Sequence, residues 1–296
     1  MKKSSKRLHE NYEYEEIYKK SIKETKEDEI ESKLRENRRK KYTYIKKTII
    51  SGPVVECEIY PVWKNGSDVP RTKVGTSRAA QKNLNDKNAR KKINRLVNTN
   101  FTEDDLMITL TYKNNYLPNE EEAKRDIQNY INRLKRRRKK DGIQEPLKYL
   151  YVIEYENNKK NSKKVRIHHH IIINKMDRNS AEGVWKKGRT DSMRLQLDDD
   201  GLSGISGYIS KGISAGRRWS YSKNLKKPII RKDRTTLSKR KVERVALAEN
   251  DYKEFFEKQY EKQGYEYYDC RTYYSDISAG YYLYARLTNK KEVRRE

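Results

Sequence analysis

Two histidines on one predicted strand are the residues of this sequence best suited to bind a metal ion. Residues 165–174, Val-Arg-Ile-His-His-His-Ile-Ile-Ile-Asn, are rich in β-branched side chains that favour a strand. Side chains alternate along a strand, so Arg166, His168 and His170 share one face, while His169 lies on the other, apolar face that packs against the core. Two neutral imidazoles on one face are typical ligands of a divalent metal. The alternative, histidines that only form hydrogen bonds on an ordinary strand, is disfavoured by the paired spacing.

A carboxylate on the preceding strand is the expected third ligand. Residues 147–156 predict a strand, and the polar turn at 157–163 returns the chain into the histidine strand as a hairpin. Glu154 and Glu156 face the same way, and Glu154 is preferred because it lies deeper in the apolar run. Either residue serves instead as an exposed cross-strand partner for Lys or Arg if no metal binds.

A tyrosine and a lysine follow on a predicted helix. Residues 202–213 carry apolar side chains at helical spacing, and Tyr208 and Lys211 lie three residues apart on one side. The chain has 24 tyrosines, so the type alone carries little weight. The position of Tyr208 after the two-histidine strand, with a cation one turn away that could lower its pKa or bind a phosphate, makes it a candidate nucleophile.

The elements that must position these residues predict an α+β fold. The sequence patterns indicate a strand at 106–112, an amphipathic helix at 118–139, a short helix at 177–185 and a strand at 192–198. We expect an antiparallel central sheet with helices mainly on one face, in the ferredoxin-like or RRM-like split β-α-β arrangement.

Two other patterns suggest ligand sites but fail on inspection. Residues 183–190 resemble a phosphate-binding loop, yet Arg189 stands in place of the required lysine and no strand precedes the first glycine. The run Asp198 to Asp200 precedes Gly201, which is more typical of a turn than of a metal site.

The charge of the chain points to a polyanionic partner. Lys and Arg number 70 against 43 Asp and Glu, a net charge of +27, which favours nucleic acid over the alternative of an anionic membrane surface. Only 33% of the 296 residues are hydrophobic, so the core must be small. We find no membrane-spanning run and no signal peptide, and Cys57 and Cys270 indicate neither a disulfide framework nor a cysteine zinc site. A reducing cytoplasm fits this composition.

Together the motifs resemble the HUH endonucleases, and within them the rolling-circle replication initiators of plasmids and small single-stranded-DNA phages. The resemblance lies in the strand ending Thr109-Leu110-Thr111-Tyr112, the two-histidine strand and the Tyr208-x-x-Lys211 helix, in the family's order. Glu154 matches the family's acidic ligand. His169 departs from the bulky apolar residue that the family prefers, but it lies on the face away from the ligands.

The resemblance implies a DNA nickase that needs Mg²⁺ or Mn²⁺, held by His168, His170 and Glu154. Tyr208 would attack the scissile phosphate to give a 5′-phosphotyrosine and a free 3′-OH for DNA replication, and Lys211 would be its phosphate or phenolate partner. The implied partners are single-stranded origin DNA and a host helicase with its replication machinery. The expected DNA-binding residues are Thr109, Thr111, Arg166, Arg217, Arg218, Trp219, Lys223 and Lys226.

The resemblance covers about residues 75–230, which we assign to the endonuclease domain. Residues 1–74 are expected to form a charged arm with a short β segment, and residues 231–296 a helix and a Tyr-rich extension that packs onto the endonuclease domain. Within the domain, the basic helix at 78–96 is suited to a phosphate backbone. The basic, aromatic stretch 217–228 is suited to unpaired bases, or is a solvated loop that Trp219 anchors.

Two other functions share these features. One is a DNA-binding regulator that keeps the fold without the chemistry, and the other is a single-Tyr transposase or mobilisation relaxase. Histidines placed before the tyrosine favour an initiator. The sequence leaves open the origin sequence, the type of replicating element, the metal and the oligomeric state, a homo-oligomer included.

Overall fold

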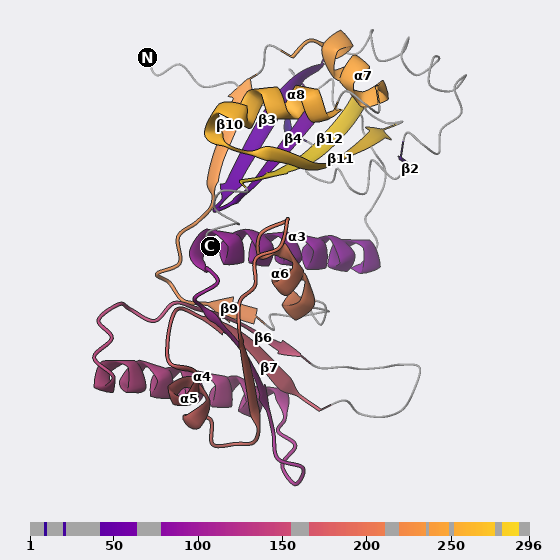
Figure 1. The fold of residues 1–296 in the computed structure, drawn as a ribbon. Coiled ribbons are helices and arrows are strands. Elements are labelled where there is room, and N and C mark those ends of the chain that lie inside the picture. Colours follow the sequence, from indigo (N-terminus) through magenta and orange to yellow (C-terminus); the bar gives the residue numbers. More distant parts are fainter. Residues whose placement is uncertain are drawn as a thin grey trace, which may run out of the picture. The chain divides into compact units, whose positions relative to one another are not determined.

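The chain forms two compact units, one from residues 78–228 and one from residues 1–77 together with 229–296. The structure, a computed structural model, describes residues 9–10, 20–21, 42–63, 78–154, 166–210, 219–234, 237–248, 252–275 and 280–289. Figure 1 shows the helices and strands of both units.

The unit of residues 78–228 is built on a five-stranded sheet in the order β8-β5-β7-β6-β9. Its strands are β5 (Leu106–Thr111), β6 (Tyr149–Glu154), β7 (His168–Ile173), β8 (Thr190–Arg194) and β9 (Trp219–Tyr221). Both β5 and β6 pair antiparallel with β7, so they run parallel to each other on its two sides. Helix α4 (Glu120–Lys140) joins them. This is the predicted split β-α-β arrangement, and the α+β fold is confirmed.

The sequence of α4 explains both its start and its buried face. Asn119 caps the first turn, and Glu122 returns the hydrogen bond to the backbone of Asn119. The predicted apolar stripe from Ala123 to Leu134 is buried against the sheet. The stripe continues four residues further to Arg138, which is only 2% exposed. Its guanidinium donates hydrogen bonds to three backbone carbonyls. This cation near the end of α4 therefore stabilises the fold from inside the protein.

Helices cover both faces of this sheet, which differs from the expectation of helices mainly on one face. On one face lie α4 and α5 (Arg178–Gly183), and on the other α3 (Arg78–Asn100) and α6 (Ser203–Ser210). The cause lies in the central strand, because Ile171, Ile172 and Ile173 are consecutive and all fully buried. A strand with apolar side chains on both faces needs cover on both.

The second unit contains a seven-stranded sheet to which both ends of the chain contribute. Along the path β10-β3-β4-β12-β11-β2 all neighbours are antiparallel, and β1 also pairs with β4. The strands are β1 (His9–Glu10), β2 (Lys20–Ser21), β3 (Tyr42–Ser51), β4 (Val54–Trp63), β10 (Ile229–Arg234), β11 (Glu266–Ser275) and β12 (Gly280–Thr288). The short β segment expected in an N-terminal arm is therefore a hairpin of two ten-residue strands, which pairs with the Tyr-rich C-terminal strand.

Two helices cover one face of the second sheet. The helix expected within residues 231–296 is divided into α7 (Lys239–Leu247) and α8 (Tyr252–Tyr260), and a short 3₁₀ turn, η3 (Glu261–Gln263), follows. Apolar side chains of both helices share a buried cluster with Cys57, Leu283 and Tyr281 of the strands. No helix among the described residues is both long and apolar enough to cross a lipid bilayer.

Gly188 lets the segment before β8 run against the end of β5. The backbone N–H of Thr111 donates to the carbonyl of Arg189 (2.9 Å), and that of Lys113 to the carbonyl of Lys187 (3.0 Å). A Cβ on Gly188 would clash with the Thr111 carbonyl oxygen and lie 2.7 Å from the carbonyl carbon of Tyr112. Residues 183–190 resemble a phosphate-binding loop in sequence, but close backbone packing, not phosphate binding, explains the glycine at position 188.

We expect Gly188→Ala to lower the free energy of unfolding by about 1–3 kcal/mol, because the added methyl group must push two backbone segments apart. The control is Gly183→Ala at the end of α5, where a Cβ has no neighbour within 4 Å. That change should be neutral or stabilise by up to about 1 kcal/mol. Urea unfolding followed by circular dichroism measures both, and equal stabilities would show that the backbone contact is not tight.

Cys57 should report on the unfolding of the second unit. Burial raises the pKa of its thiol from 9.0 to about 12, so at pH 8 it holds about 1,000-fold less thiolate than an ordinary thiol. In a Cys270→Ser background, a disulfide reagent should therefore label the native protein very slowly and the urea-unfolded protein at the normal rate. Rapid labelling without denaturant would contradict the buried position of Cys57.

Candidate active site

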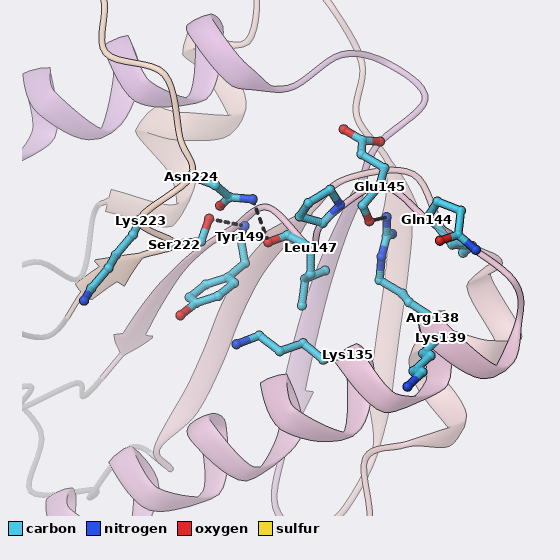
Figure 2. Close-up of a pocket in the computed structure, with 12 residues that line it drawn as sticks. Lys135, Arg138, Lys139, Gln144, Glu145, Leu147, Tyr149, Ser222, Lys223 and Asn224 are labelled. Atoms are coloured by element: carbon cyan, nitrogen blue, oxygen red, sulfur yellow. Dashed lines mark hydrogen bonds between the residues drawn. The ribbon is translucent and has the colours of Figure 1, made fainter.

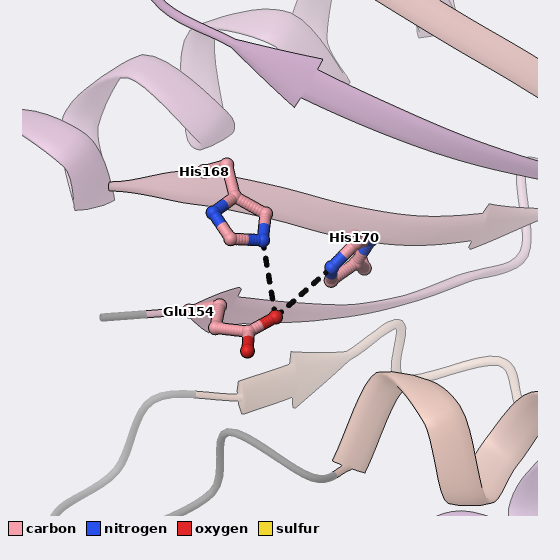
Figure 3. A group of neighbouring side chains, drawn as sticks. All are labelled: Glu154, His168 and His170. Atoms are coloured by element: carbon pink, nitrogen blue, oxygen red, sulfur yellow. Dashed lines mark hydrogen bonds and ion pairs between the residues drawn. The ribbon is translucent and has the colours of Figure 1, made fainter. Parts of the chain in front are cut away.

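The pairing of β6 with β7 brings a carboxylate and two imidazoles together. Glu154 lies opposite His168 in the register, and His170 is two residues further along the same face. Oε2 of Glu154 is 3.1 Å from Nε2 of each histidine. Dashed lines in Figure 3 mark these two contacts. All three ligand atoms lie within 4.8 Å of one another. The face alternation predicted for the histidine strand is confirmed, and Glu156, the alternative ligand, falls outside the described residues.

Neighbouring oxygens orient both rings of this triad, the three side chains Glu154, His168 and His170. Nδ1 of His168 is 3.1 Å from the carbonyl oxygen of Arg166, a group that only accepts, so Nδ1 carries the hydrogen. Nδ1 of His170 is 3.1 Å from the hydroxyl of Thr109, which can accept in the same way. In these tautomers each Nε2 directs a lone pair toward the space beside Glu154.

Burial keeps the inner histidine of the triad neutral. The side chain of His170 is 2% exposed, and its pKa is lowered first by burial and then by His168, against an opposing effect of Glu154. A metal ligand must be unprotonated, so this environment favours binding. Two imidazole nitrogens and one carboxylate oxygen suit a divalent cation and leave its other positions for water or substrate oxygens. The residues present therefore fit a metal ion.

Tyr208 lies directly against the triad. Its ring packs edge-on to the ring of His170, with the centroids 5.4 Å apart. The rest of α6 is held in place by burial of Ser206, Ile209 and Ser210, whereas Tyr208 is 53% exposed. A phenol that is both adjacent to the ligands and open to solvent is accessible to a large substrate. Lys211, Arg217 and Arg218 fall outside the described residues.

His169 belongs to the core on the other face of β7. Its Nε2 is 2.8 Å from the hydroxyl of Tyr112, and its ring packs edge-on against Tyr112 and Trp185. Burial above all, and then the two neighbouring histidines, lower its pKa to about 3. The neutral ring therefore fills the position of an apolar residue while hydrogen-bonded to a tyrosine.

The other predicted DNA-binding residues fall into two groups. Thr109, Thr111 and Arg166 line a groove of about 930 Å³ beside His168. The hydroxyl of Thr111 donates to the carbonyl of Arg189 (3.0 Å), and Arg166 donates to the side chain of Asn114. The second group lies near β9, at the sheet edge beyond β6, where Trp219 and Lys223 line a groove of about 690 Å³. The side chain of Lys226 is exposed nearby in sequence. The structure therefore does not bring the two groups together.

Lys92 belongs to the basic helix that the sequence analysis expected to follow a phosphate backbone, but its contacts with aromatic rings were not predicted. Its ammonium group lies 5.5 Å from the ring centre of Trp219 and 5.2 Å from that of Tyr221. Those two rings stack with their centroids 5.7 Å apart and 20° between their planes. This contact joins α3 to β9, two segments that are far apart in the sequence, so no local pattern predicts it. The Asp198–Asp200 run forms a turn closed by Gly201, as expected.

Thr109→Val should weaken Mn²⁺ binding about 10-fold or more, because it removes the oxygen that orients Nδ1 of His170. Isothermal titration calorimetry with Mn²⁺ measures the change. The control is Thr111→Val, two residues along the same strand face, whose hydroxyl bonds to Arg189 rather than to a triad ring. If both variants bind like the wild type, Thr109 does not position the ligand.

The part of the chain that holds the site matches a known family. Residues 105–213 match the sequence model of a family of replication-associated proteins, described under the name "Replication-associated protein ORF2". No curated protein and no solved structure matches the chain. The matched stretch runs from the start of β5 through α6 and contains the triad and Tyr208. The match supports a replication-associated role, with an initiator as the kind of protein it indicates.

Proposed function

We propose that this protein is a replication initiator that nicks and rejoins single-stranded DNA at an origin, in the manner of the HUH endonucleases. The observation that carries the proposal is the exposed phenol of Tyr208 against His170 of a metal-ligand triad. The family match to residues 105–213 and the net charge of +27 support a DNA substrate. The catalytic part is the unit of residues 78–228.

The triad and the tyrosine divide the chemistry between them. Glu154, His168 and His170 would hold the metal, and Thr109 and the Arg166 carbonyl fix the two rings. A bound Mg²⁺ or Mn²⁺ supplies positive charge that polarises the scissile phosphate. The contact between the rings of Tyr208 and His170 keeps the phenol within reach of a phosphate that binds at the triad.

The proposed step exchanges one phosphate ester for another. The oxygen of Tyr208 forms a bond to phosphorus as the bond from phosphorus to the 3′ oxygen breaks. The phenol loses its proton and the departing 3′ oxygen gains one, which leaves a 3′-OH for rolling-circle synthesis. The 5′ phosphate stays on Tyr208 with its ester energy conserved, so attack by a 3′-OH rejoins the strand. Lys211 is the proposed partner of the phosphate or the phenolate.

Tyr208→Phe should abolish a covalent protein–DNA adduct, a loss of at least about 1,000-fold, because it removes the nucleophilic oxygen. The assay incubates the protein with labelled single-stranded oligonucleotides from the DNA flanking its gene, with Mn²⁺ or with EDTA. The adduct should survive denaturing electrophoresis, require the metal and be absent in the variant. The control Tyr268→Phe changes another exposed tyrosine, in the second unit, and should leave the adduct unchanged.

A wild-type protein that binds these oligonucleotides but forms no adduct with any of them would contradict the proposal. It would favour the alternative of a DNA-binding regulator that keeps the fold without the chemistry. If the adduct still forms in Tyr208→Phe, the reaction takes place but another residue is the nucleophile.

A further inference from the structure

A third groove, lined mainly by basic and polar residues, lies at the end of β6 opposite to the triad. It has a volume of about 870 Å³, and Figure 2 shows Lys135 and Lys139 on α4, Tyr149 on β6, and Lys223 and Asn224 after β9 around it. Glu154 ends β6, whereas Tyr149 begins it. The length of the strand, about 17 Å, therefore separates this groove from the triad.

The groove carries unbalanced positive charge. Lys135 and Lys139 are one helical turn apart and exposed, and among the described residues neither forms a salt bridge. The carboxylate in the lining, Glu145, is paired with Lys148 at 2.9 Å, a hydrogen bond that lowers its pKa. Arg138 adds a fixed charge behind the wall, since its guanidinium is held by backbone carbonyls. The groove therefore attracts anions.

Aromatic rings connect this groove to the next one. The rings of Tyr149 and Tyr151 are nearly parallel, with 19° between their planes and 6.3 Å between their centroids. Tyr151 lines the neighbouring groove of about 690 Å³, and Lys223 lines both. Gln128 donates to the hydroxyl of Tyr151 at 3.0 Å and fixes its position. The rings and lysines thus follow one another along the edge of the sheet.

The neighbouring groove passes around the edge strand. Tyr151 belongs to the cluster on the α4 face, whereas Trp219 and Tyr221 belong to the cluster on the face of α3 and α6. All three line the same groove at β9, with Lys92 beside the second pair of rings. Because Tyr208 on α6 lies on that second face, the two grooves form a path from the α4 face toward the side of the sheet that carries the triad. We name this path the edge groove.

We propose that the edge groove binds the single strand of DNA that extends away from the triad, with Lys135, Lys139 and Lys223 on its phosphates. The partly exposed ring of Tyr149, which packs on the buried ring of Tyr151, stacks on its bases. The identity of this ligand rests on the proposed function. Lysines beside parallel rings suit a strand whose bases are unpaired, because stacking on an exposed ring needs a free base face. The bases of a duplex already stack on one another, so a duplex could interact only with the positive charge of the groove.

Equilibrium binding in EDTA tests this independently of nicking. Labelled oligothymidylate is titrated with the full-length protein over a range of salt, with fluorescence anisotropy as the readout. The variant Lys135→Ala/Lys139→Ala should reduce the slope of log affinity against log salt by about 1.4, since each phosphate contact on a single strand contributes about 0.7. The matched control, Arg136→Ala/Lys140→Ala, removes the same charge at the same spacing from exposed positions that line none of the described pockets. Its slope should equal that of the wild type.

The stacking component has its own pair of variants. Tyr149→Leu should weaken binding by about 5-fold or more, and Tyr149→Phe, which keeps the ring, should bind like the wild type. Circular dichroism confirms that each variant is folded. An unlabelled duplex of the same length should compete less well than the single strand.

The outcomes separate the two proposals. Equal slopes for the two double variants, or equal affinities for Tyr149→Leu and Tyr149→Phe, would overturn the edge groove even if the Tyr208 adduct forms. Competition by duplex as strong as that by the single strand would also overturn it, since charge alone would then suffice. If the expected losses occur but no adduct forms, the groove stands as a single-strand site and the nicking proposal fails.

Discussion

The register of the β6–β7 hairpin is the constraint on which the candidate site depends. Backbone pairing places Glu154 opposite His168, and the pleat then puts His170 on the same face. A slip of one residue would move the carboxylate to the opposite face. Burial prevents such a slip, because Val152 and Ile172 pack under one layer of helices and Ile153 and Ile171 under the other. The hydrophobic core therefore sets the metal-ligand geometry as directly as the ligands do.

Covering both faces of the sheet also positions Tyr208, the proposed nucleophile. A ferredoxin-like sheet with helices on one side would leave the triad face open, whereas here α3 and α6 pack on it. The buried Ile209 anchors α6, and the residue before it, Tyr208, stands at the margin of that helix beside His170. The burial of Ile209, which completes the core on this face, therefore also places the Tyr208 ring beside His170. The placement of Tyr208 beside His170 and the second layer of helices are consequences of one packing requirement.

Local sequence patterns predicted the features that depend on local structure, namely which face of a strand or helix each side chain occupies. Alternation along 165–174 identified the faces of the three histidines, and helical periodicity identified the buried stripe of α4. Extended by one further turn, that stripe would also have identified Arg138 as a buried residue. Contacts between segments that are distant in the sequence produce no such local pattern. The pairing of β4 with β12, and of Lys92 with the rings of β9, depends on tertiary packing that no local period encodes.

The distribution of burial across the site matches the two chemical tasks. A metal ligand must stay neutral and fixed, and His170 is 2% exposed with its pKa lowered by that burial, while His168 and Glu154 are 24% and 22% exposed at the opening. A nucleophile that attacks a polymer must instead be reached from outside, and Tyr208 is 53% exposed. A structural tyrosine in a core of this kind is hidden, as Tyr130 is, with its hydroxyl bonded to a backbone carbonyl. Packing alone does not require an exposed phenol beside the buried His170. The exposure of Tyr208 therefore supports the proposed chemistry on a large substrate.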